Sequence, residues 1–347
     1  MSQQTLKVVL VGCGGISAAW FRPAKEIPGL EIVGLVDLIE ENARKRAAEF
    51  DLPEALIGSD LTQVLQAARP EIVFDCTVPS AHTNTTITAL RHGCHVLGEK
   101  PLADSMENAR RMVEAAQDAG KFYAVMQNRR YLEQTRRLKQ FIASGALGDL
   151  TTVNCDFYLG AHFGGFRDQM EHVLLMDMAI HTFDQARFMT GADPLSVYCK
   201  EWNPAGSWYR HGASAVAIFE MINPLSGEPL VYTYRGSWCS EGLHTSWEAQ
   251  WRFVGQRGSA TWDGQQGFAA DVVAKTGGFH SEFDHPVITP YTADEKFRGH
   301  ASCIGDFVEC VRTGRLPDTI CTDNIKSLSM VYAAIDSAER RQLVEIK

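Results

Sequence analysis

Asp177 and His181 are side chains whose types and spacing suit acid–base chemistry, and Lys100 follows an apolar run at a strand end, where open α/β sheets place ligands, although a lysine there taken alone is more often a surface residue. The segment from about Leu174 to Met189 is expected to be a helix, and Asp177 and His181 stand four residues apart on it, on one face. Histidine titrates near neutral pH, so His181 suits the removal of a proton from a hydroxyl group. An ammonium at Lys100 would stabilise the developing alkoxide, and Asp177 would orient the substrate or hold the imidazole. Such a set is suited to oxidising a carbon that bears a hydroxyl group.

A glycine pattern near the start of the chain predicts where a hydride acceptor would bind. Gly12-Cys13-Gly14-Gly15-Ile16-Ser17 lies between an aliphatic run and a predicted helix. In that context Gly12 makes the tight turn, Gly14 lets the backbone approach a pyrophosphate, and the helix N-terminus attracts the anion. The pattern therefore predicts a dinucleotide site.

A carboxylate at the end of the second strand strengthens this prediction and selects the cofactor. Asp37 lies about twenty residues past the glycines, where a carboxylate can bind the ribose hydroxyls. It would repel a 2′-phosphate, and the next residues, Leu38-Ile39-Glu40, include no cation. NAD is therefore favoured over NADP.

The elements that must position these residues change in character near Asp149. Before it, short apolar runs alternate with amphipathic segments, which is typical of a doubly wound parallel sheet. The runs are Leu6 to Val11, Glu31 to Val36, Ile72 to Cys76, His95 to Leu97 and Phe122 to Met126. After it come longer runs rich in β-branched and aromatic residues, which predict a large, mostly antiparallel open sheet. These are Thr151 to Tyr158, Ser214 to Met221, Leu230 to Trp238 and Trp247 to Val254.

The bulk properties limit the classes of protein and partner. A chain of 347 residues is expected to form two domains, here residues 1–127 and 128–347. The last helix of the chain is able to pack back on the first domain. The net charge of −9 argues against nucleic-acid and anionic-membrane partners. No apolar run is long enough to span a membrane, and residues 1–7 do not resemble a secretion signal. The nine cysteines are scattered and include no C-x-x-C pair, as expected of reduced thiols in a cytoplasmic protein.

Five motifs, in order, make the sequence similar to the Gfo/Idh/MocA oxidoreductase family over nearly its whole length. They are Gly12 to Ser17, Thr77-Val78-Pro79-Ser80-Ala81-His82, Gly98-Glu99-Lys100-Pro101, Gln127-Asn128-Arg129-Arg130 and Asp177 to Asp184. The resemblance implies a Rossmann domain followed by an α/β domain whose open sheet face commonly forms a dimer or tetramer interface. It also implies that Lys100 meets both the nicotinamide and the reacting hydroxyl, with Asp177 and His181 as its catalytic partners.

The remaining site residues follow from the same motifs. The expected cofactor contacts are Gly12, Gly14, Gly15, Ile16, Asp37, Thr77, Pro79, His82, Glu99 and Lys100. The expected substrate contacts are Lys100, Asp177, His181, Arg167 and Asn128. For His82 a buried or helix-capping role is an equal alternative. For Arg167 the alternative is ion pairing, and Asp184 is expected to be structural. No metal is expected, because no compact third-ligand motif accompanies the histidines and Asp177.

The substrate is expected to be a small polyhydroxy molecule. An aldose oxidised at C1 to a lactone is favoured, with D-apiose as one specific candidate, and a secondary alcohol of an inositol or polyol is the alternative. Aromatic residues crowd the second half, where Trp208 or Trp238 is expected to touch substrate. From another class, a non-catalytic sensor of NAD or sugar remains an alternative, although such relatives lack the lysine that this chain has.

Overall fold

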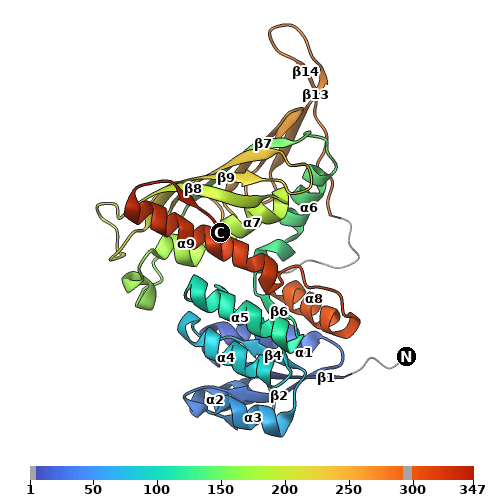
Figure 1. Cartoon of the computed structure of the whole chain (residues 1–347), viewed down its shortest axis with the longest axis vertical. Helices are drawn as coiled ribbons and strands as arrows, with labels where there is room; N and C mark the ends of the chain where they lie inside the picture. The colour runs from blue at the N-terminus through green and yellow to red at the C-terminus, as the bar shows by residue number, and fades with distance from the viewer. Residues whose placement is uncertain (1–4, 292–298) are drawn as a thin grey trace. The chain divides into compact units, whose positions relative to one another are not determined.

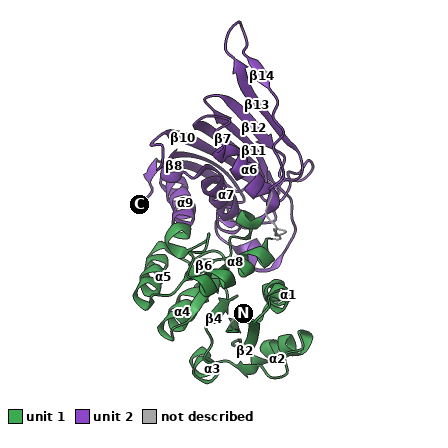
Figure 2. Ribbon diagram, turned by 90° about the vertical axis from the view of Figure 1, so that its right-hand side faces the viewer, with its two compact units in different colours: residues 1–131, 297–325 green, residues 132–296, 326–347 purple. Residues whose placement is uncertain are grey.

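The structure is a computed structural model that describes residues 5–291 and 299–347. It separates into two compact units, shown in different colours in Figure 2. The first is made of residues 1–131 and 297–325, and the second of residues 132–296 and 326–347. The sequence places the boundary after residue 127 and allows the last helix to pack back on the first domain; the first unit extends to residue 131 and includes residues 297–325.

The first unit is built on a six-stranded parallel sheet of order β3-β2-β1-β4-β5-β6. This is the strand order of a dinucleotide-binding Rossmann sheet, in which ligands bind at the carboxyl ends of the strands where the order reverses, here between β1 and β4. The strands are β1 (Leu6–Val11), β2 (Leu30–Val36), β3 (Leu56–Gly58), β4 (Ile72–Asp75), β5 (His95–Gly98) and β6 (Tyr123–Val125). Their near-continuous burial explains the unbroken apolar runs in the sequence.

Six α-helices connect or cover these strands in the described part of the first unit. They are α1 (Ala18–Glu26), α2 (Glu40–Glu49), α3 (Leu61–Ala68), α4 (Pro79–Arg91), α5 (Met106–Ala119) and α8 (His300–Thr313). Ser105 caps α5 by accepting from the backbone N–H of Asn108 at 3.1 Å, and Gly120 ends it in the left-handed conformation. Ile304 and Phe307 of α8 belong to the same buried core as Trp20 and Phe21 of α1, which places this late segment in the first unit.

The second unit is built on a nine-stranded sheet of order β14-β13-β12-β11-β7-β10-β9-β8-β15. All neighbouring strands are antiparallel except β7 and β10, which are parallel. The strands are β7 (Leu150–Tyr158), β8 (Asp193–Trp202), β9 (Ser214–Ile222), β10 (Pro229–Ser237), β11 (Gln250–Gly255), β12 (Gly258–Trp262), β13 (Phe268–Lys275), β14 (Glu282–Asp284) and β15 (Val344–Glu345). In Figure 1, β13 and β14 form a hairpin that projects from one end of the sheet.

Helices cover one face of this sheet. They are α6 (Glu133–Ala143), a π-helical segment (Leu174–Ala179) that continues into α7 (Ile180–Thr190), and most of α9 (Cys321–Arg340). Phe183 of α7 makes edge-on ring contacts with Phe219, Tyr232 and Tyr234 of the sheet, at centroid distances of 4.9 to 6.1 Å. These inward rings alternate with outward polar and apolar residues, as half-buried strands require.

The predicted fold class is confirmed, while one predicted helix and one predicted strand differ from what the structure shows. The predicted helix over Leu174 to Met189 is not α-helical throughout, because its first turn is π-helical and contains Asp177. The strand predicted over Trp247 to Val254 begins only at Gln250. All nine cysteines are free. Within residues 5–291 and 299–347, no helix is both long and apolar enough to cross a membrane.

Candidate active site

The glycine loop after β1 leaves room for a pyrophosphate. Gly12 has a φ of +88°, and a Cβ built on it would lie 2.7 Å from the backbone of Cys76, so the turn requires glycine. A Cβ on Gly14 or Gly15 would meet no described atom within 4 Å, so the space beside them is open. Ile16, also predicted to touch the cofactor, is 45% exposed at the same turn. These residues fit a dinucleotide.

Asp37 lies beside the glycine loop, as the sequence predicts. One carboxylate oxygen accepts from the backbone N–H of Cys13 at 2.8 Å, and the other accepts from that of Ile39 at 2.9 Å. No sequence pattern indicates a cation here, but Arg46 of α2 reaches the same loop. Its guanidinium donates to the carbonyl oxygen of Gly14 at 2.9 Å and pairs with Glu49.

The loop after β4 is organised around a buried acid. Asp75 accepts from the backbone N–H and the hydroxyl of Thr77, at 3.0 and 2.6 Å, and Pro79 opens α4 directly after. Thr77 and Pro79, both predicted cofactor contacts, therefore follow β4 at the carboxyl edge of the sheet.

His82 lies beneath this edge and is 1% exposed. Its ring nitrogens are each 3.0 Å from a backbone carbonyl oxygen, Nδ1 from that of Pro101 and Nε2 from that of Thr77. His82 thus links the loops that follow β4 and β5. This geometry favours the buried, structural alternative over a direct contact with the cofactor.

Glu99 and Lys100 follow β5 at the same edge. The Glu99 side chain is 8% exposed and accepts from the indole N–H of Trp20 at 2.8 Å and from the backbone N–H of Lys100 at 3.1 Å. A buried carboxylate held by two donors is fixed in place. Glu99 is therefore a rigid support directly before the candidate catalytic lysine.

His300, at the start of α8, is a member of this cluster that the sequence does not predict. Its Nδ1 is 3.2 Å from the amide nitrogen of Asn128, and its Nε2 is 4.0 Å from the Glu99 carboxylate. With the amide as donor, Nδ1 accepts and the ring proton lies on Nε2, toward Glu99. The pKa of His300 is lowered overall. Burial lowers it most, the nearby Glu99 carboxylate raises it, and the Lys100 ammonium lowers it. No local pattern marks His300, since α8 alone brings it to Glu99 across some two hundred residues of sequence.

The second unit holds the predicted acid–histidine pair. Asp177 is 6% exposed and accepts from Nε of Arg167 at 2.6 Å. Arg167 is predicted to bind substrate, but its Nε is used to hold Asp177. Asp177 lies in the π-helical turn, a distortion that is frequent at functional sites.

His181 lies in the first turn of α7 and is 8% exposed. It thus follows Asp177 on the same continuous helical segment. Asp184 accepts from the hydroxyl of Ser327 on α9 at 2.7 Å, and that hydroxyl also accepts from Arg187 at 2.9 Å. Asp184 therefore joins α7 to α9, in agreement with a structural part.

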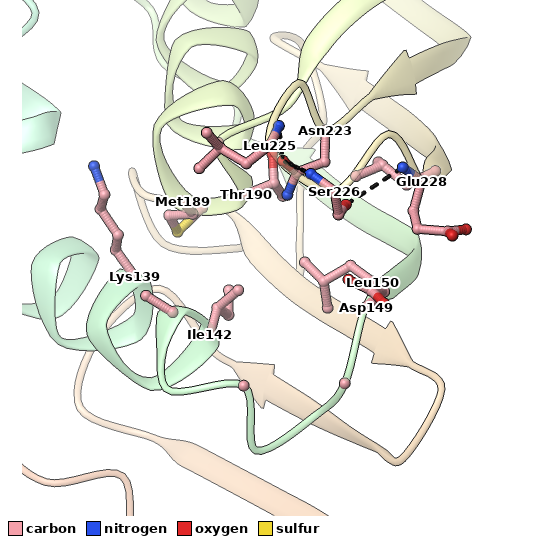
Figure 3. A pocket seen from close by; sticks show the side chains of 15 residues that line it. Lys139, Ile142, Asp149, Leu150, Met189, Thr190, Asn223, Leu225, Ser226 and Glu228 are labelled. Carbon is pink, nitrogen blue, oxygen red and sulfur yellow. Dashed lines mark hydrogen bonds between the residues drawn. The ribbon is translucent and has the colours of Figure 1, made fainter.

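The second unit also has a cavity that lies apart from these residues. This cavity of about 590 Å³ is lined by the ends of α6 and α7 and by the β9–β10 turn, and none of Arg167, Asp177 and His181 lines it (Figure 3).

Among the residues described, no group of three or more His, Cys, Asp or Glu side chains is placed to hold a metal ion. His162 instead pairs with Glu241 at 2.8 Å.

Comparison with known proteins adds to this geometry. The oxidoreductase family with an NAD-binding Rossmann fold matches residues 6–127, and the GFO/IDH/MocA C-terminal domain matches residues 135–261. An uncharacterised protein of Sinorhizobium fredii is 26% identical over 99% of this chain and 96% of its own length. An inositol 2-dehydrogenase of Arthrobacter is 31% identical over 56% of this chain, a match that spans only 57% of that enzyme.

Among solved structures, the fold is similar to that of an oxidoreductase from Agrobacterium radiobacter in complex with NAD+, L-tartaric acid and magnesium. The two superpose with a TM-score of 0.84 over 99% of each chain, at 20% sequence identity. The two matching domains together account for most of the sequence, and each falls on the unit with the corresponding fold. The chain therefore belongs to the Gfo/Idh/MocA family of oxidoreductases.

Proposed function

We propose that this protein is a dehydrogenase that oxidises a hydroxyl group of a small sugar-like molecule, with NAD as the hydride acceptor. The observation that carries the proposal is the Glu99–Lys100 pair. It lies at the carboxyl edge of a Rossmann sheet whose glycine loop and Asp37 fit a dinucleotide. A fixed carboxylate directly before a lysine at this edge is suited to holding an ammonium near the reacting oxygen.

The chain's own residues divide the work of the reaction. NAD supplies the hydride acceptor when bound. We assign the proton of the substrate hydroxyl to His181, because an imidazole accepts a proton near neutral pH. Lys100 stabilises the negative charge that develops on that oxygen, and Asp177 orients the substrate or the imidazole. Asn128, on the same edge as Lys100, is assigned to the substrate as a hydrogen-bonding partner.

NAD is proposed over NADP because of Asp37. Its carboxylate is held beside the glycine loop, where a 2′-phosphate would meet it. Arg46 is the opposing feature, since it is a cation on the same loop. Its guanidinium is engaged by the Gly14 carbonyl and by Glu49, which supports the preference for NAD.

Two positions of oxidation fit this chemistry. The first is C1 of an aldose, giving a lactone, with D-apiose as the specific candidate. The second is a secondary alcohol of an inositol or polyol, which the similarity to an inositol 2-dehydrogenase supports. A panel of aldoses, polyols and inositols with NAD or NADP, followed at 340 nm, tests the proposal. Steady NADH formation with product identification separates lactone from ketone, and no NADH with any member would favour a non-catalytic sensor.

We also propose that the open face of the nine-stranded sheet forms a homodimer or homotetramer interface. One row of paired residues crosses this face from Tyr198 through Ile218 and Thr233 to Asn154. Tyr198 and Ile218 are 46% and 45% exposed, so two neighbouring apolar side chains are open on this face. Sedimentation at micromolar concentration should show a dimer or tetramer for the wild type and a shift toward monomer for Ile218→Lys. A wild-type monomer would contradict the proposal.

A further inference from the structure

We propose that the second unit carries a binding site for a second sugar ring, so that the substrate is a disaccharide or a glycoside of comparable size. The site is an aromatic wall made of Phe163, Trp238 and Trp247, joined to the candidate catalytic acid by Arg167. This inference rests on the proposed function and narrows its substrate. It does not depend on which carbon is oxidised.

The wall is built from loops at one edge of the nine-stranded sheet. β7 and β10 are parallel, and β8 runs the same way because both β8 and β10 pair antiparallel with β9. Their following loops, residues 159–173, 203–213 and 238–249, therefore gather at one edge. A bridge between Gly160 and Cys239 joins the first loop to the third. The hydroxyl of Tyr209 donates to the Ala161 carbonyl at 3.0 Å and joins the second loop to the first.

Three rings from two of these loops pack together, two of them exposed and the third buried beneath them. The Phe163 ring lies 6.1 Å from both Trp238 and Trp247, and those two indoles are 6.0 Å apart. Trp238 is 1% exposed and forms the floor, whereas Phe163 and Trp247 are 54% and 46% exposed. A large aromatic surface left open beside polar groups is typical of a binding site. The sequence favours Trp208 or Trp238 as the substrate contact, but the open indole of this wall is Trp247.

Arg167 connects this surface to the chemistry. Its guanidinium lies 5.0 Å from the centre of the Phe163 ring and 4.7 Å from that of Phe166, while its Nε binds Asp177 at 2.6 Å. Arg167 therefore contacts both Asp177 and the ring of Phe163, and links the candidate catalytic acid to the wall. A substrate whose reacting ring is bound at Asp177 would place an attached second ring on the wall.

The chemistry of the wall suits a sugar. A pyranose or furanose ring has an apolar face of C–H groups that packs on an aromatic ring, and hydroxyl groups at its rim that need polar partners. Arg167 supplies donors at one side of the wall.

The wall is held in shape before any ligand binds. His162, next to Phe163, stacks on Trp208 at 3.7 Å and pairs with Glu241 of the third loop at 2.8 Å. The backbone N–H of Arg210 donates to the Asp168 carbonyl at 2.8 Å. A preformed surface loses less entropy on binding than a disordered one, which favours a ligand site.

The test compares substrates that differ only by the second sugar. One pair is a free aldose and the disaccharide that carries it at the reducing end. The other is a methyl glycoside and the glycoside in which a second sugar replaces the methyl group. For the pair that the wild type oxidises, we expect a kcat/KM at least about 10-fold higher for the two-ring member, equal to about 1.4 kcal/mol.

Variants of the wall should change this ratio and a matched control should not. Trp247→Ala and Phe163→Ala should each lower the two-ring to one-ring ratio of kcat/KM by about 10-fold, and Trp247→Phe, which keeps a ring, by less. Phe283→Ala is the control, since Phe283 is a 45% exposed phenylalanine on β14 of the same unit. Its ratio should equal that of the wild type.

Three outcomes would overturn the inference, and each has a different consequence. The subsite would be rejected if one-ring sugars were oxidised with an equal or higher kcat/KM than two-ring sugars. It would also be rejected if Trp247→Ala left the two-ring to one-ring ratio of kcat/KM unchanged. Either result would leave the proposed dehydrogenase activity standing. No NADH from any sugar would reject the proposed function and the subsite with it. Loss of self-association in Trp247→Ala with an unchanged ratio would assign the wall to a second copy of the chain instead.

Discussion

Replacing Asp37 by asparagine should move the cofactor preference from NADH toward NADPH. The side-chain amide of Asp37→Asn would keep an oxygen for the backbone N–H of Ile39, but its NH₂ group cannot accept from that of Cys13, which Asp37 now does at 2.8 Å. The glycine loop would lose one charge-assisted hydrogen bond, and the ribose would lose a carboxylate acceptor. We expect NADH to bind about 10-fold more weakly.

The gain for NADPH comes from removing charge repulsion. A carboxylate and a phosphate about 5 Å apart repel by about 3 kcal/mol at an effective dielectric constant of about 20, before screening by salt. Arg46, already 2.9 Å from the Gly14 carbonyl, would then attract the phosphate without the opposing carboxylate. The ratio of the two dissociation constants should therefore shift by about 100-fold, or about 2.7 kcal/mol.

Isothermal titration of NADH and NADPH measures this ratio without any substrate. Glu40→Gln is the matched control, because it removes the same charge three residues away on a side chain that pairs with Arg44 at 2.7 Å. Its ratio should stay within about 2-fold of the wild type. An unchanged ratio in Asp37→Asn, or an equal shift in Glu40→Gln, would refute the role assigned to Asp37.

Three further predictions concern the supports of the site and the fold. Gly12→Ala should abolish measurable NADH binding and lower the melting temperature, because its Cβ would lie 2.7 Å from the Cys76 backbone at a φ of +88°; normal binding in titration would contradict this. Burial, to which Lys121 adds, lowers the pKa of His95 in the folded protein to about 4. In the unfolded chain the pKa of this histidine is near 6.5, so between these two pH values the unfolded chain binds a proton that the folded protein does not. The free energy of unfolding should therefore fall as pH drops from about 6.5 to 4, and urea melts of His95→Asn should show that fall reduced by about 1 to 2 kcal/mol. Phe183→Ala should lower the free energy of unfolding by about 3 to 5 kcal/mol in the same urea melts, because it leaves a cavity among the buried aromatic rings that contact Phe183. A decrease below about 1 kcal/mol would argue against that packing.

The parallel sheet was predictable because its strands are buried on both faces. Such strands read as unbroken apolar runs, and β1 and β4 appear in the sequence nearly at their observed bounds. The sequence does not show β3, because its three residues are only partly buried; β6 is equally short, but it is fully buried within an apolar run. The sequence does not show β8, because the strand begins with Asp193 and Pro194, exposes the apolar Leu195 and Tyr198, and buries Ser196, so no clean alternation appears.

Local spacing also predicts that Asp37 lies beside the glycine loop, but it does not predict contacts between distant segments. Asp37 follows the glycines at a fixed distance along the chain, so spacing alone places it beside their loop. His300 reaches Glu99 only because α8 packs into the first unit's core. Arg46 reaches the Gly14 carbonyl through the direction of α2, which no pattern of apolar residues records.

The π-helical turn that carries Asp177 is a third feature beyond sequence reasoning. Periodicity predicts which face of a helix is apolar, but it does not distinguish hydrogen bonds to the fourth residue from those to the fifth. His172, two residues before this turn, has a φ of +50° and pairs with Glu201, so tertiary contacts define where the helix begins. The role of Arg167 as the partner of Asp177 depends on the same geometry.

The central claim is that this chain transfers a hydride from a sugar-like alcohol to NAD with Lys100 at the reacting oxygen. The most direct measurement is the rate of NADH formation by Lys100→Ala beside the wild type, on the best substrate of the panel, with the dissociation constant for NAD measured in parallel. We expect the rate to fall by at least about 10³-fold while NAD binding changes by less than about 3-fold. A Lys100→Ala protein that forms NADH at the wild-type rate would contradict the account.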